Sequence, residues 1–241
     1  MSSKEQFVKT IFNTIADKYD LTNLVISFGR CNYWRRMLMR KIGKLDGAVI
    51  IDVCCGTGKV TMDLAKKAGP NGEVIGIDLS EKMLAVAGKN LEKKNMNRGS
   101  GYGQIKLIQG NALTLPFPEN TFDCATIAYG LRNVTDLRQA LLEMKRVVKP
   151  GGLVASLEMS VPSGPVFKKM YDIYAGQCIP LLGKAMVKNK EAYRYLYQSI
   201  ISYLNPDEVT STLTELGYVN TQCFILTGGI AAIHLGNKPV K

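Results

Sequence analysis

Residues that build metal centres and cross-linked folds are scarce in this sequence. It has a single histidine, His234, and none of its six cysteines forms a C-x-x-C pair, so no metal site is predicted. Two of the cysteines, Cys54 and Cys55, are adjacent, and Cys124 lies in a strand pattern, where a free thiol packs as a small apolar group. The even number of cysteines therefore does not indicate disulfides, and a reducing compartment is expected.

Long apolar runs are absent as well. No stretch has the length needed to span a bilayer, and the N-terminus lacks the pattern of a signal peptide. These absences predict a cytoplasmic chain, either free or peripheral to a membrane.

Acidic residues are few relative to basic ones. Lysine and arginine number 31 against 20 acidic residues, which gives a formal net charge of +11. Such an excess favours a polyanion, either nucleic acid or an anionic membrane face, or it only improves solubility. A basic stripe with interleaved aromatic residues, the pattern of single-strand binding, is missing, so no nucleic-acid partner is predicted.

A glycine turn organises the rest of the chain. An aliphatic strand pattern over 48–53 includes Asp52, a turn with Gly56 and Gly58 follows, and a helical pattern continues over 59–69. This is the opening strand–turn–helix unit of a doubly wound sheet. The glycines let the chain turn and let a ligand lie against the backbone, while the start of the helix presents free N–H groups.

The next strand pattern ends in a carboxylate. Residues 73–78 form a short apolar run that closes with Asp78, twenty residues after Gly58. At this spacing the second strand of such a fold delivers an acid to the hydroxyls of a ribose. The acid therefore indicates a nucleoside-bearing cofactor, and both a dinucleotide and S-adenosylmethionine satisfy it.

Strand and helix patterns alternate from residue 48 to residue 158. Strands separated by helices at this spacing require parallel pairing with right-handed crossovers. The predicted strands are 48–53, 73–78, 105–109, 122–129 and 153–158, and the predicted helices are 4–17, 32–43, 59–69, 81–94, 135–148 and 206–216. A polar link without regular period is expected at 17–23, and a mobile glycine-rich surface loop at 95–103.

The predicted helix 32–43 has an apolar side and a basic side. The apolar side carries Trp34, Met37, Leu38 and Ile42, and the basic side carries Arg35, Arg36, Arg40 and Lys44. A basic amphipathic helix with a tryptophan suits a membrane surface. The more common outcome is a solvated basic face whose apolar side packs on the sheet.

Residues 163–203 interrupt the alternation of strands and helices. They carry helical patterns and six tyrosines, at positions 171, 174, 193, 195, 197 and 203. We expect a helical insert over the carboxyl edge of the sheet, where open α/β folds bind ligands. The tyrosines either line an aromatic substrate pocket or only pack a lid.

The C-terminal part predicts a hairpin. Two strand patterns, at 218–226 and 230–235, are joined by Thr227-Gly228-Gly229, so one of them should run antiparallel to the rest of the sheet. A dinucleotide-binding sheet normally closes with parallel strands. The hairpin therefore favours a sheet with a reversed seventh strand, as in the class I methyltransferases.

On these features the chain resembles the class I S-adenosylmethionine-dependent methyltransferases, and within them the ubiquinone/menaquinone biosynthesis C-methyltransferase family. The resemblance extends over nearly the whole chain, and its most specific segments are Gly130-Leu131-Arg132-Asn133-Val134 and the terminal run from Gly228 to His234. Shorter matches are Phe12 to Asp20, Asp52 to Gly58, Gly110-Asn111-Ala112, Phe122-Asp123 and Arg146 to Gly152. Cys54 is a departure, because many methyltransferases have glycine there.

The resemblance implies an α/β fold with a doubly wound, mostly parallel seven-stranded Rossmann-like sheet. It implies one domain, 1–241, divided into an N-terminal helical segment (1–45), a cofactor-binding core (46–160), a helical lid insert (161–205) and a final helix and hairpin (206–241). The implied reaction is S-adenosylmethionine-dependent C-methylation of a prenylated quinol, demethylmenaquinol to menaquinol. The alternatives are the benzoquinol precursor of ubiquinone, another small aromatic acceptor, or a NAD-dependent oxidoreductase.

A prenylated substrate also implies partners. We expect peripheral contact with the inner, anionic face of the cytoplasmic membrane, to which the basic helix 32–44 would contribute, and a homodimer is an open alternative to a monomer. These expectations rest on the resemblance and on the net charge.

The cofactor residues implied by the resemblance surround the glycine turn. Gly56 and Gly58 would let the methionine portion of S-adenosylmethionine approach, Thr57 would hydrogen-bond it, and Asp52 is a further cofactor-binding candidate. Asp78 would bind the ribose, and Asn111 and Ala112 would border the adenine. Turn capping is the alternative for Thr57 and Asn111, and for Asp78 it is a favourable position at the start of the following helix.

Three residues are candidates for the chemistry. Arg132 would place a permanent charge beside the ring oxygen and favour the quinolate, which pushes electron density onto the reacting carbon. Asn133 would orient the ring or a water, and Tyr19 would close the pocket. The alternative for Arg132 is a salt bridge that anchors the following helix. His234 is more simply a packed residue on the hairpin than a base.

Overall fold

The protein, described here by a computed structural model, is built on one sheet of seven strands whose order is β3-β2-β1-β4-β5-β7-β6. The strands are β1 Val49–Val53, β2 Glu73–Asp78, β3 Gln104–Gln109, β4 Phe122–Ala128, β5 Val148–Met159, β6 Val219–Leu226 and β7 Ala231–Asn237. The structure describes residues 2–96, 101–162, 164, 169, 174 and 190–240, and the side chains of all of these except 190–193.

The direction of the strands confirms the predicted fold class. β1 pairs in parallel with β2 and β4, and the parallel pairing extends outward to β3 and β5. β7 is the reversed strand, antiparallel to both β5 and β6. The turn that joins β6 to β7 contains Gly228 at φ 63° and Gly229 at φ 97°, a backbone conformation that glycine adopts without a steric penalty.

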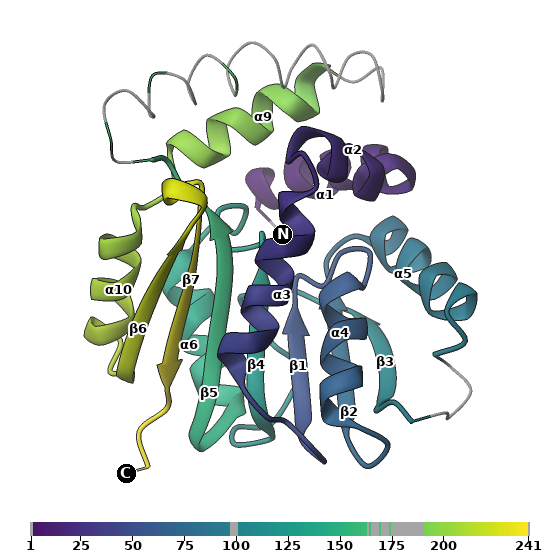
Figure 1. The fold of residues 1–241 in the computed structure, drawn as a ribbon, viewed down its shortest axis with the longest axis vertical. Helices are drawn as coiled ribbons and strands as arrows, with labels where there is room; N and C mark the ends of the chain where they lie inside the picture. Colours follow the sequence, from purple (N-terminus) through teal and green to yellow (C-terminus); the bar gives the residue numbers. More distant parts are fainter. Residues whose placement is uncertain are drawn as a thin grey trace.

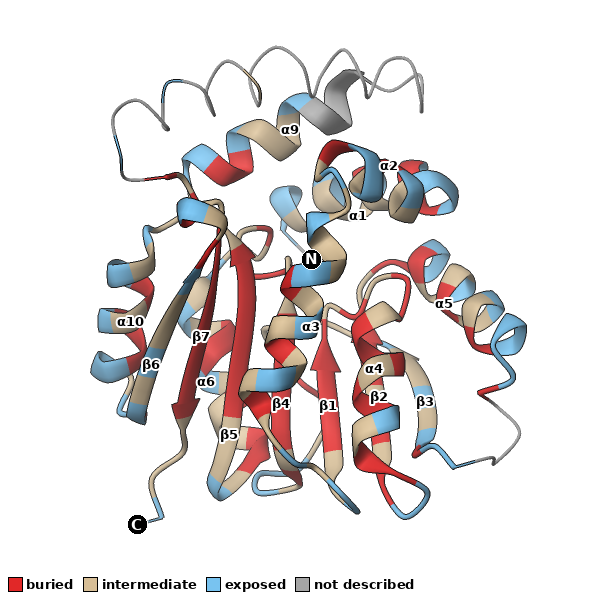
Figure 2. Ribbon diagram, in the orientation of Figure 1, coloured by how far each residue is buried: buried red, intermediate tan, exposed pale blue. Residues whose placement is uncertain are grey.

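Helices that precede β1 or connect successive strands cover both faces of the sheet (Figure 1). They are α3 Arg30–Ile42, α4 Lys59–Ala68, α5 Glu81–Lys93, α6 Leu137–Val147 and α10 Pro206–Glu215. α3 and α4 pack on one face of the sheet, and α6 and α10 on the other. Burial follows this arrangement, because the central strands are buried and the edge strands β3 and β6 are not (Figure 2).

The apolar side of α3 packs on the sheet, as the second interpretation of helix 32–43 states. Trp34, Leu38 and Ile42 are buried in the same cluster as residues of β5 and β7. The indole Nε1 of Trp34 donates a hydrogen bond to Thr227 Oγ1 at 2.8 Å. This apolar side therefore stabilises the core and cannot enter a membrane in this fold.

The N-terminal segment and α9 lie beyond the carboxyl ends of the strands (Figure 1). The elements are α1 Ser3–Ile15, the 3₁₀ turn η1 Ala16–Lys18, α2 Tyr19–Ile26 and α9 Lys190–Ile201. Buried residues of α1, α2 and α9 form one cluster with Met83 of α5. α9 agrees with the predicted helical insert, whereas most of 163–189, and residues 97–100 of the glycine-rich loop, lie outside the described residues.

One prediction of secondary structure is wrong. The segment 17–23, predicted to be an irregular polar link, is helical through η1 and α2. The sequence of this segment lacks the apolar periodicity of a helix packed on a core. The reason is that α2 buries only Thr22 and Ile26 and leaves much of its apolar surface exposed. Burial of these two residues against neighbouring helices, which sequence periodicity does not record, stabilises the helix.

Within the described part of the chain, no helix has both the length and the apolar character that crossing a bilayer requires. Groups of three or more histidine, cysteine or acidic side chains arranged to hold a metal ion are likewise absent from the described residues.

Candidate active site

The glycine turn after β1 has a left-handed backbone at three positions. Cys54, Gly56 and Gly58 have φ angles of 55°, 54° and 78°. Glycine is favoured at such angles, which explains why a glycine in place of Cys54 is common in methyltransferases. A Cβ atom placed on Gly56 would meet nothing within 4 Å, so open space lies directly above its backbone. The turn therefore presents bare backbone to a cavity.

Asp52, predicted to bind the cofactor, is instead hydrogen-bonded to threonines of α4 and β4. Its carboxylate is buried and accepts hydrogen bonds from Thr61 Oγ1 at 2.6 Å and from Thr126 Oγ1 at 2.7 Å. Burial raises its pKa to about 6, against the opposing effect of the two hydroxyl groups. Asp52 lies within the core and lines none of the four cavities described below.

Asp78 reaches the turn from the end of β2. One carboxylate oxygen accepts the N–H of Gly56 and the other the N–H of Ser80, both at 2.8 Å. Burial raises the pKa of Asp78, while these backbone donors lower it. The two bonds fix the carboxylate at the carboxyl edge of the sheet and leave its remaining lone pairs to accept hydroxyl groups.

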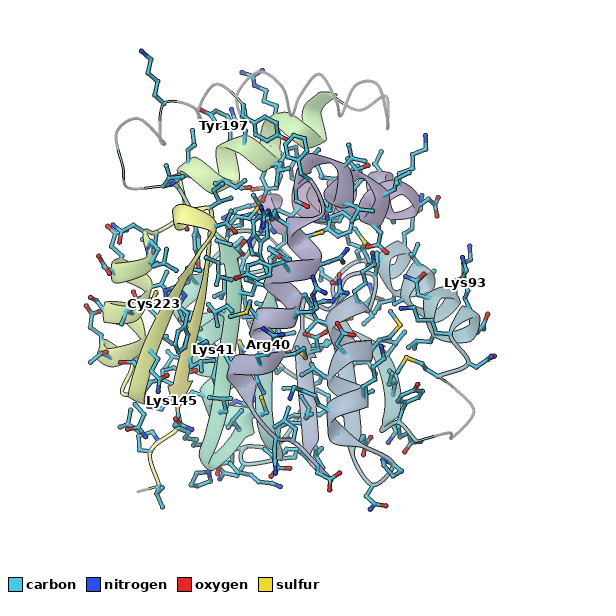
Figure 3. The ribbon with its side chains drawn as sticks, viewed as in Figure 1. Arg40, Lys41, Lys93, Lys145, Tyr197 and Cys223 are labelled. Carbon is cyan, nitrogen blue, oxygen red and sulfur yellow. The ribbon has the colours of Figure 1, made fainter. Side chains whose placement is uncertain are left out.

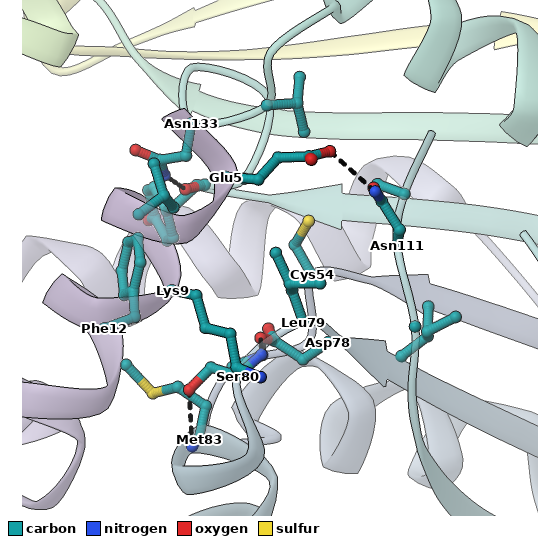
Figure 4. A pocket seen from close by; sticks show the side chains of 18 of the residues that line it. Glu5, Lys9, Phe12, Cys54, Asp78, Leu79, Ser80, Met83, Asn111 and Asn133 are labelled. Carbon is teal, nitrogen blue, oxygen red and sulfur yellow. Dashed lines mark hydrogen bonds between the residues drawn. The ribbon is translucent and has the colours of Figure 1, made fainter. Parts of the chain in front are cut away.

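Beside Asp78 lies a cavity of about 90 Å³, here called the first cavity (Figure 4). It brings together six residues that the sequence predicts for the site. They are Gly56, Asp78, Asn111, Ala112, Tyr19 and Asn133. Apolar side chains, among them Leu79 and Met83, complete its wall.

Helix α1 covers the first cavity, which its sequence pattern did not predict. Glu5, Lys9 and Phe12 line the cavity (Figure 4). Glu5 accepts a hydrogen bond from the side-chain amide of Asn111 at 2.8 Å, and Lys9 pairs with Glu81 at 2.7 Å. The apolar period of α1 was visible in the sequence, but its docking over the end of β3 depends on contacts distant in sequence.

Two other predicted cofactor residues lie outside the first cavity. Thr57 donates its hydroxyl hydrogen to Asp20 of α2 at 2.7 Å. It lines a separate cavity of about 80 Å³, here called the fourth cavity, together with Gly56 and Tyr19. Gly58 lines none of the four, and a Cβ atom there would lie 3.1 Å from the Cβ of Ala87. The structure thus gives Gly58 a packing and backbone role at the start of α4.

A second cavity of about 330 Å³ adjoins the first, because Tyr19 and Tyr129 line both. Its wall is mostly aromatic and apolar and includes Trp34, Phe28 and Ile230. Arg132 contributes a charged group to this wall. A planar, largely apolar molecule with a polar edge fits such a lining.

Arg132 is not an isolated cation. Its Nη1 donates to Glu158 of β5 and, at 2.9 Å, to the carbonyl oxygen of Tyr129. Burial alone lowers its pKa, but the neighbouring Glu158 raises it, and the net shift is upward. Its Nε has no partner among the described residues. The guanidinium is therefore paired in charge yet keeps one donor free.

The predicted catalytic residues Tyr19, Arg132 and Asn133 meet around a third, small cavity of about 30 Å³. The amide of Asn133 donates to the carbonyl oxygen of Tyr129 at 2.9 Å and accepts from the hydroxyl of Tyr195 at 3.1 Å. Burial raises the pKa of Tyr19, and the nearby Arg132 lowers it.

Tyr129, the last residue of the predicted strand 122–129, was not predicted to belong to the site. Its φ angle of 58° is unusual for a residue with a side chain. The strained backbone is held by three hydrogen bonds, two into its carbonyl oxygen from Arg132 and Asn133 and one from its N–H to Leu157. Its hydroxyl is buried without a partner among the described residues, and burial raises its pKa well above the ordinary value.

His234 lies away from these cavities. It is buried in β7, with Nε2 at 2.9 Å from the carbonyl oxygen of Pro206, and burial lowers its pKa. This position agrees with the interpretation of His234 as a packed residue of the hairpin.

Comparison with known proteins decides the family. A model of the ubiE/COQ5 methyltransferase family matches residues 1–238. The chain belongs to the ubiE/COQ5 methyltransferase family. The resemblance stated from the sequence is thereby confirmed. A demethylmenaquinone methyltransferase from Staphylococcus aureus is 45% identical over 237 residues, 98% of this chain and 95% of that protein.

Solved structures share the fold of this ubiE/COQ5 family member. A SAM-dependent methyltransferase from Thermotoga maritima is 18% identical, with a TM-score of 0.64 over 96% of this chain and 99% of the other. Phosphoethanolamine N-methyltransferase 2 from Haemonchus contortus, in complex with S-adenosyl-L-methionine, is 15% identical, with a TM-score of 0.60 over 85% of this chain and 52% of the other. At such identities the likeness shows the fold alone.

As a member of the ubiE/COQ5 family, the chain is an S-adenosylmethionine-dependent methyltransferase, and the NAD-dependent alternative is not favoured. The residues of the first cavity suit this donor. The backbone at Gly56 borders open space, and two backbone N–H groups fix the carboxylate of Asp78, a group that can accept hydroxyl hydrogens. Leu79 and Met83 offer apolar surface to a base.

Proposed function

We propose that this methyltransferase transfers a methyl group to a ring carbon of demethylmenaquinol and produces menaquinol. The observation that carries the proposal is the second cavity, which adjoins the first through Tyr19 and Tyr129 and is large and aromatic enough for a bicyclic quinol. The identity of 45% to a demethylmenaquinone methyltransferase over nearly its full length supports the choice of acceptor.

For the donor, we assign the first cavity. Asp78 would accept the ribose hydroxyls, Asn111 and Ala112 would border the adenine, and Gly56 would lie against the methionine portion. Thr57, Gly58 and Asp52 would contribute indirectly, by fixing the turn and the start of α4. Thr57 does so through its hydrogen bond to Asp20, and Asp52 through its hydrogen bond from Thr61. When bound, S-adenosylmethionine supplies a methyl group already activated on a sulfonium sulfur.

For the acceptor, we assign the second cavity. The unpartnered Nε of Arg132 would donate to a ring oxygen, and the unpartnered hydroxyl of Tyr129 offers a second hydrogen bond. A phenol-like hydroxyl has a pKa of about 10, so a donor that stabilises its deprotonated form increases the reactive fraction at neutral pH. Asn133 would orient the ring by holding the Tyr129 backbone, and Tyr19 would close the cavity.

Placement of the two reactants is the main contribution of such a site. The methyl group would leave the sulfonium, which becomes a neutral thioether, as its bond to the ring carbon forms, and the ring would then regain aromaticity by losing the proton of that carbon to solvent. This reaction needs no nucleophile or metal from the protein, so the protein's task is to align the ring carbon with the methyl group. Orientation of this kind supplies roughly 7–11 kcal/mol in favourable cases. The tyrosines that line both cavities also exclude water from the space between the reactants.

The test is methyl transfer from labelled S-adenosylmethionine to acceptors with a short prenyl tail. We expect product from reduced demethylmenaquinone, at least tenfold less from the benzoquinol precursor of ubiquinone, and none from the oxidised quinone. Equal turnover of the two quinols would show that the enzyme does not select demethylmenaquinol, and the proposed substrate would become a prenylated quinol of either ring type. Product from the oxidised quinone would contradict the role given to the ring oxygen, and no product from any of the three would refute the proposed function.

We also include in this proposal a peripheral contact with an anionic membrane, because a prenylated acceptor resides in a bilayer. The net charge of +11 supports it. A homodimer stays a prediction.

A further inference from the structure

Helix α2 carries a stripe of exposed apolar side chains. Leu21, Leu24, Val25 and Phe28, here called the α2 ridge, are exposed by 56%, 39%, 37% and 78%. Their spacing of three, four and seven residues places them on one side of the helix and its following turn. Twelve large apolar residues are exposed in the described chain, and the ridge with Tyr33 contains five of them. Such clustering marks an interaction surface.

The segment of the chain that contains the α2 ridge is rich in positive charge. Residues 16–44 contain seven lysines and arginines and two acidic residues. One of the acids, Asp20, is already engaged by the Thr57 hydroxyl and by Lys59. Arg30 comes two residues after Phe28 and is exposed, and Arg36 is exposed farther along α3. Arg40, also exposed, lies toward the end of α3 that is distant from α2 (Figure 3). This charge complements an anionic surface rather than a second copy of a basic chain.

The α2 ridge also reaches the second cavity. Ile26, Ser27, Phe28 and Arg30 line that cavity, and Phe28 is at the same time the most exposed residue of the ridge. The cavity therefore approaches the protein surface where the apolar stripe ends. A long apolar substituent on a ring bound in the cavity would leave the protein beside the ridge.

We propose that the α2 ridge docks on the surface of an anionic lipid bilayer and places the second cavity against it. The proposal rests on the proposed function, because it takes the acceptor to be a prenylated quinol dissolved in the bilayer. It also replaces helix 32–44, which the sequence predicted for the membrane contact, by α2. Helix α3, for which a membrane surface was one of two interpretations, buries its apolar side in the core, so it can contribute only the charge of its exposed arginines. The insertion is supplied by α2.

Flotation of the purified full-length protein with vesicles tests the proposal. At low salt we expect binding to vesicles of phosphatidylcholine with phosphatidylglycerol and at least tenfold weaker binding to phosphatidylcholine alone. Leu21→Ser with Leu24→Ser should weaken binding to the anionic vesicles at least tenfold, since neither side chain lines a cavity. The matched control, Leu142→Ser with Ile225→Ser, removes two exposed apolar side chains elsewhere and should bind as the unmodified protein does.

Two further measurements separate this proposal from the proposed function. The ridge variant should methylate a soluble acceptor without a prenyl tail at the unmodified rate, and a vesicle-embedded acceptor at least tenfold more slowly. Absence of binding by the unmodified protein, or equal binding by the ridge and control variants, would overturn the docking surface, whatever the acceptor proves to be. A change from dimer to monomer in the ridge variant, with vesicle binding unchanged, would assign the ridge to an interface between copies of the chain and would also overturn it.

Discussion

Arg132 and Glu158 form an ion pair that is almost completely shielded from solvent, with side-chain exposures of 4% and 2%. Arg132 follows β4 and Glu158 lies near the end of β5, so the pair links the carboxyl ends of two neighbouring strands. Glu158 also accepts the backbone N–H of Arg132 and of Met159. Arg132 also lines the second cavity, and its Nε is buried without a partner among the described residues.

Breaking this pair should destabilise the fold. Glu158→Gln leaves the charge of Arg132 buried and unpaired, and we expect the free energy of unfolding to fall by about 3–5 kcal/mol in urea denaturation. Arg138→Gln, which breaks an exposed pair with Glu215, is the control and should change it little.

A double variant separates the structural role of the pair from its chemical role. Arg132→Met with Glu158→Leu replaces the two charges by apolar groups of similar size, so stability should return to near that of the unmodified protein. Binding of S-adenosylmethionine should be retained, and methyl transfer should be lost. Methyl transfer by the double variant at the unmodified rate would remove Arg132 from the chemistry.

The hydroxyl of Tyr129 should matter for the acceptor and not for the fold. Tyr129→Phe removes a buried group that has no partner among the described residues, so stability should be unchanged or slightly higher. We expect kcat/KM for the quinol to fall about tenfold, which corresponds to about 1.4 kcal/mol, with unchanged affinity for S-adenosylmethionine. Tyr218→Phe is the control, because the hydroxyl of Tyr218 donates to Leu141 at 2.7 Å. It should cost about 1 kcal/mol of stability and leave turnover intact.

Asp78 should determine donor affinity. Asp78→Ala removes the acceptor proposed for the ribose and should weaken binding of S-adenosylmethionine at least tenfold in calorimetry, while the circular dichroism spectrum of the fold persists. Glu73→Ala, at the other end of β2 and paired with Lys106, is the control. Equal affinities in the two variants would exclude Asp78 from the donor site.

Asp52 should make stability depend on pH. Burial raises its pKa from 3.8 to about 6, so the folded state favours the protonated form. The preference of the folded state for the protonated carboxyl stabilises the fold fully below the unfolded pKa. This stabilisation is lost as pH rises through about 6, which lowers the free energy of unfolding by about 3 kcal/mol. Asp52→Asn lacks this cost, so its stability relative to the unmodified protein should increase between pH 4 and pH 7.

The control for this measurement has the opposite sign. The ammonium of Lys149 and the N–H of Val49 lower the pKa of Asp123, although partial burial acts against them. Its contribution is present at neutral pH and is lost as pH falls, so Asp123→Asn should be relatively less stable at pH 7 than at pH 4. Urea unfolding of both variants at the two pH values checks the pair, and a flat difference for Asp52→Asn would contradict the raised pKa.

Local patterns predicted the parts of this site that depend on neighbours in sequence. Asp78 and Gly56 meet because parallel strands end at one edge of the sheet, and the spacing of the two motifs already required it. The reversed strand β7 followed from two strand patterns with a short glycine turn between them. The helicity of α2 was missed because it depends on burial of Ile26 among helices distant in the chain.

The same distinction applies to the charged residues. The sequence shows that Arg132 follows a strand, but its partner Glu158 is 26 positions away, and nothing local pairs them. Likewise Thr57 lies in the predicted turn, yet its partner Asp20 comes from α2, 37 positions earlier. Charge and hydrogen-bond partners of this kind depend on strand order and helix docking.

By itself, then, the sequence determined the alternation of strands and helices, the bare turn at Gly56, the acid at Asp78 and the family, because periodicity, glycine conformation and motif spacing are properties of adjacent residues. Only the tertiary structure decided that α1 covers the first cavity, that Tyr129 lies between two cavities and that α2 rather than α3 exposes the apolar surface. These relations arise from packing between segments far apart in the chain, where burial selects one among several faces that the sequence leaves equally available.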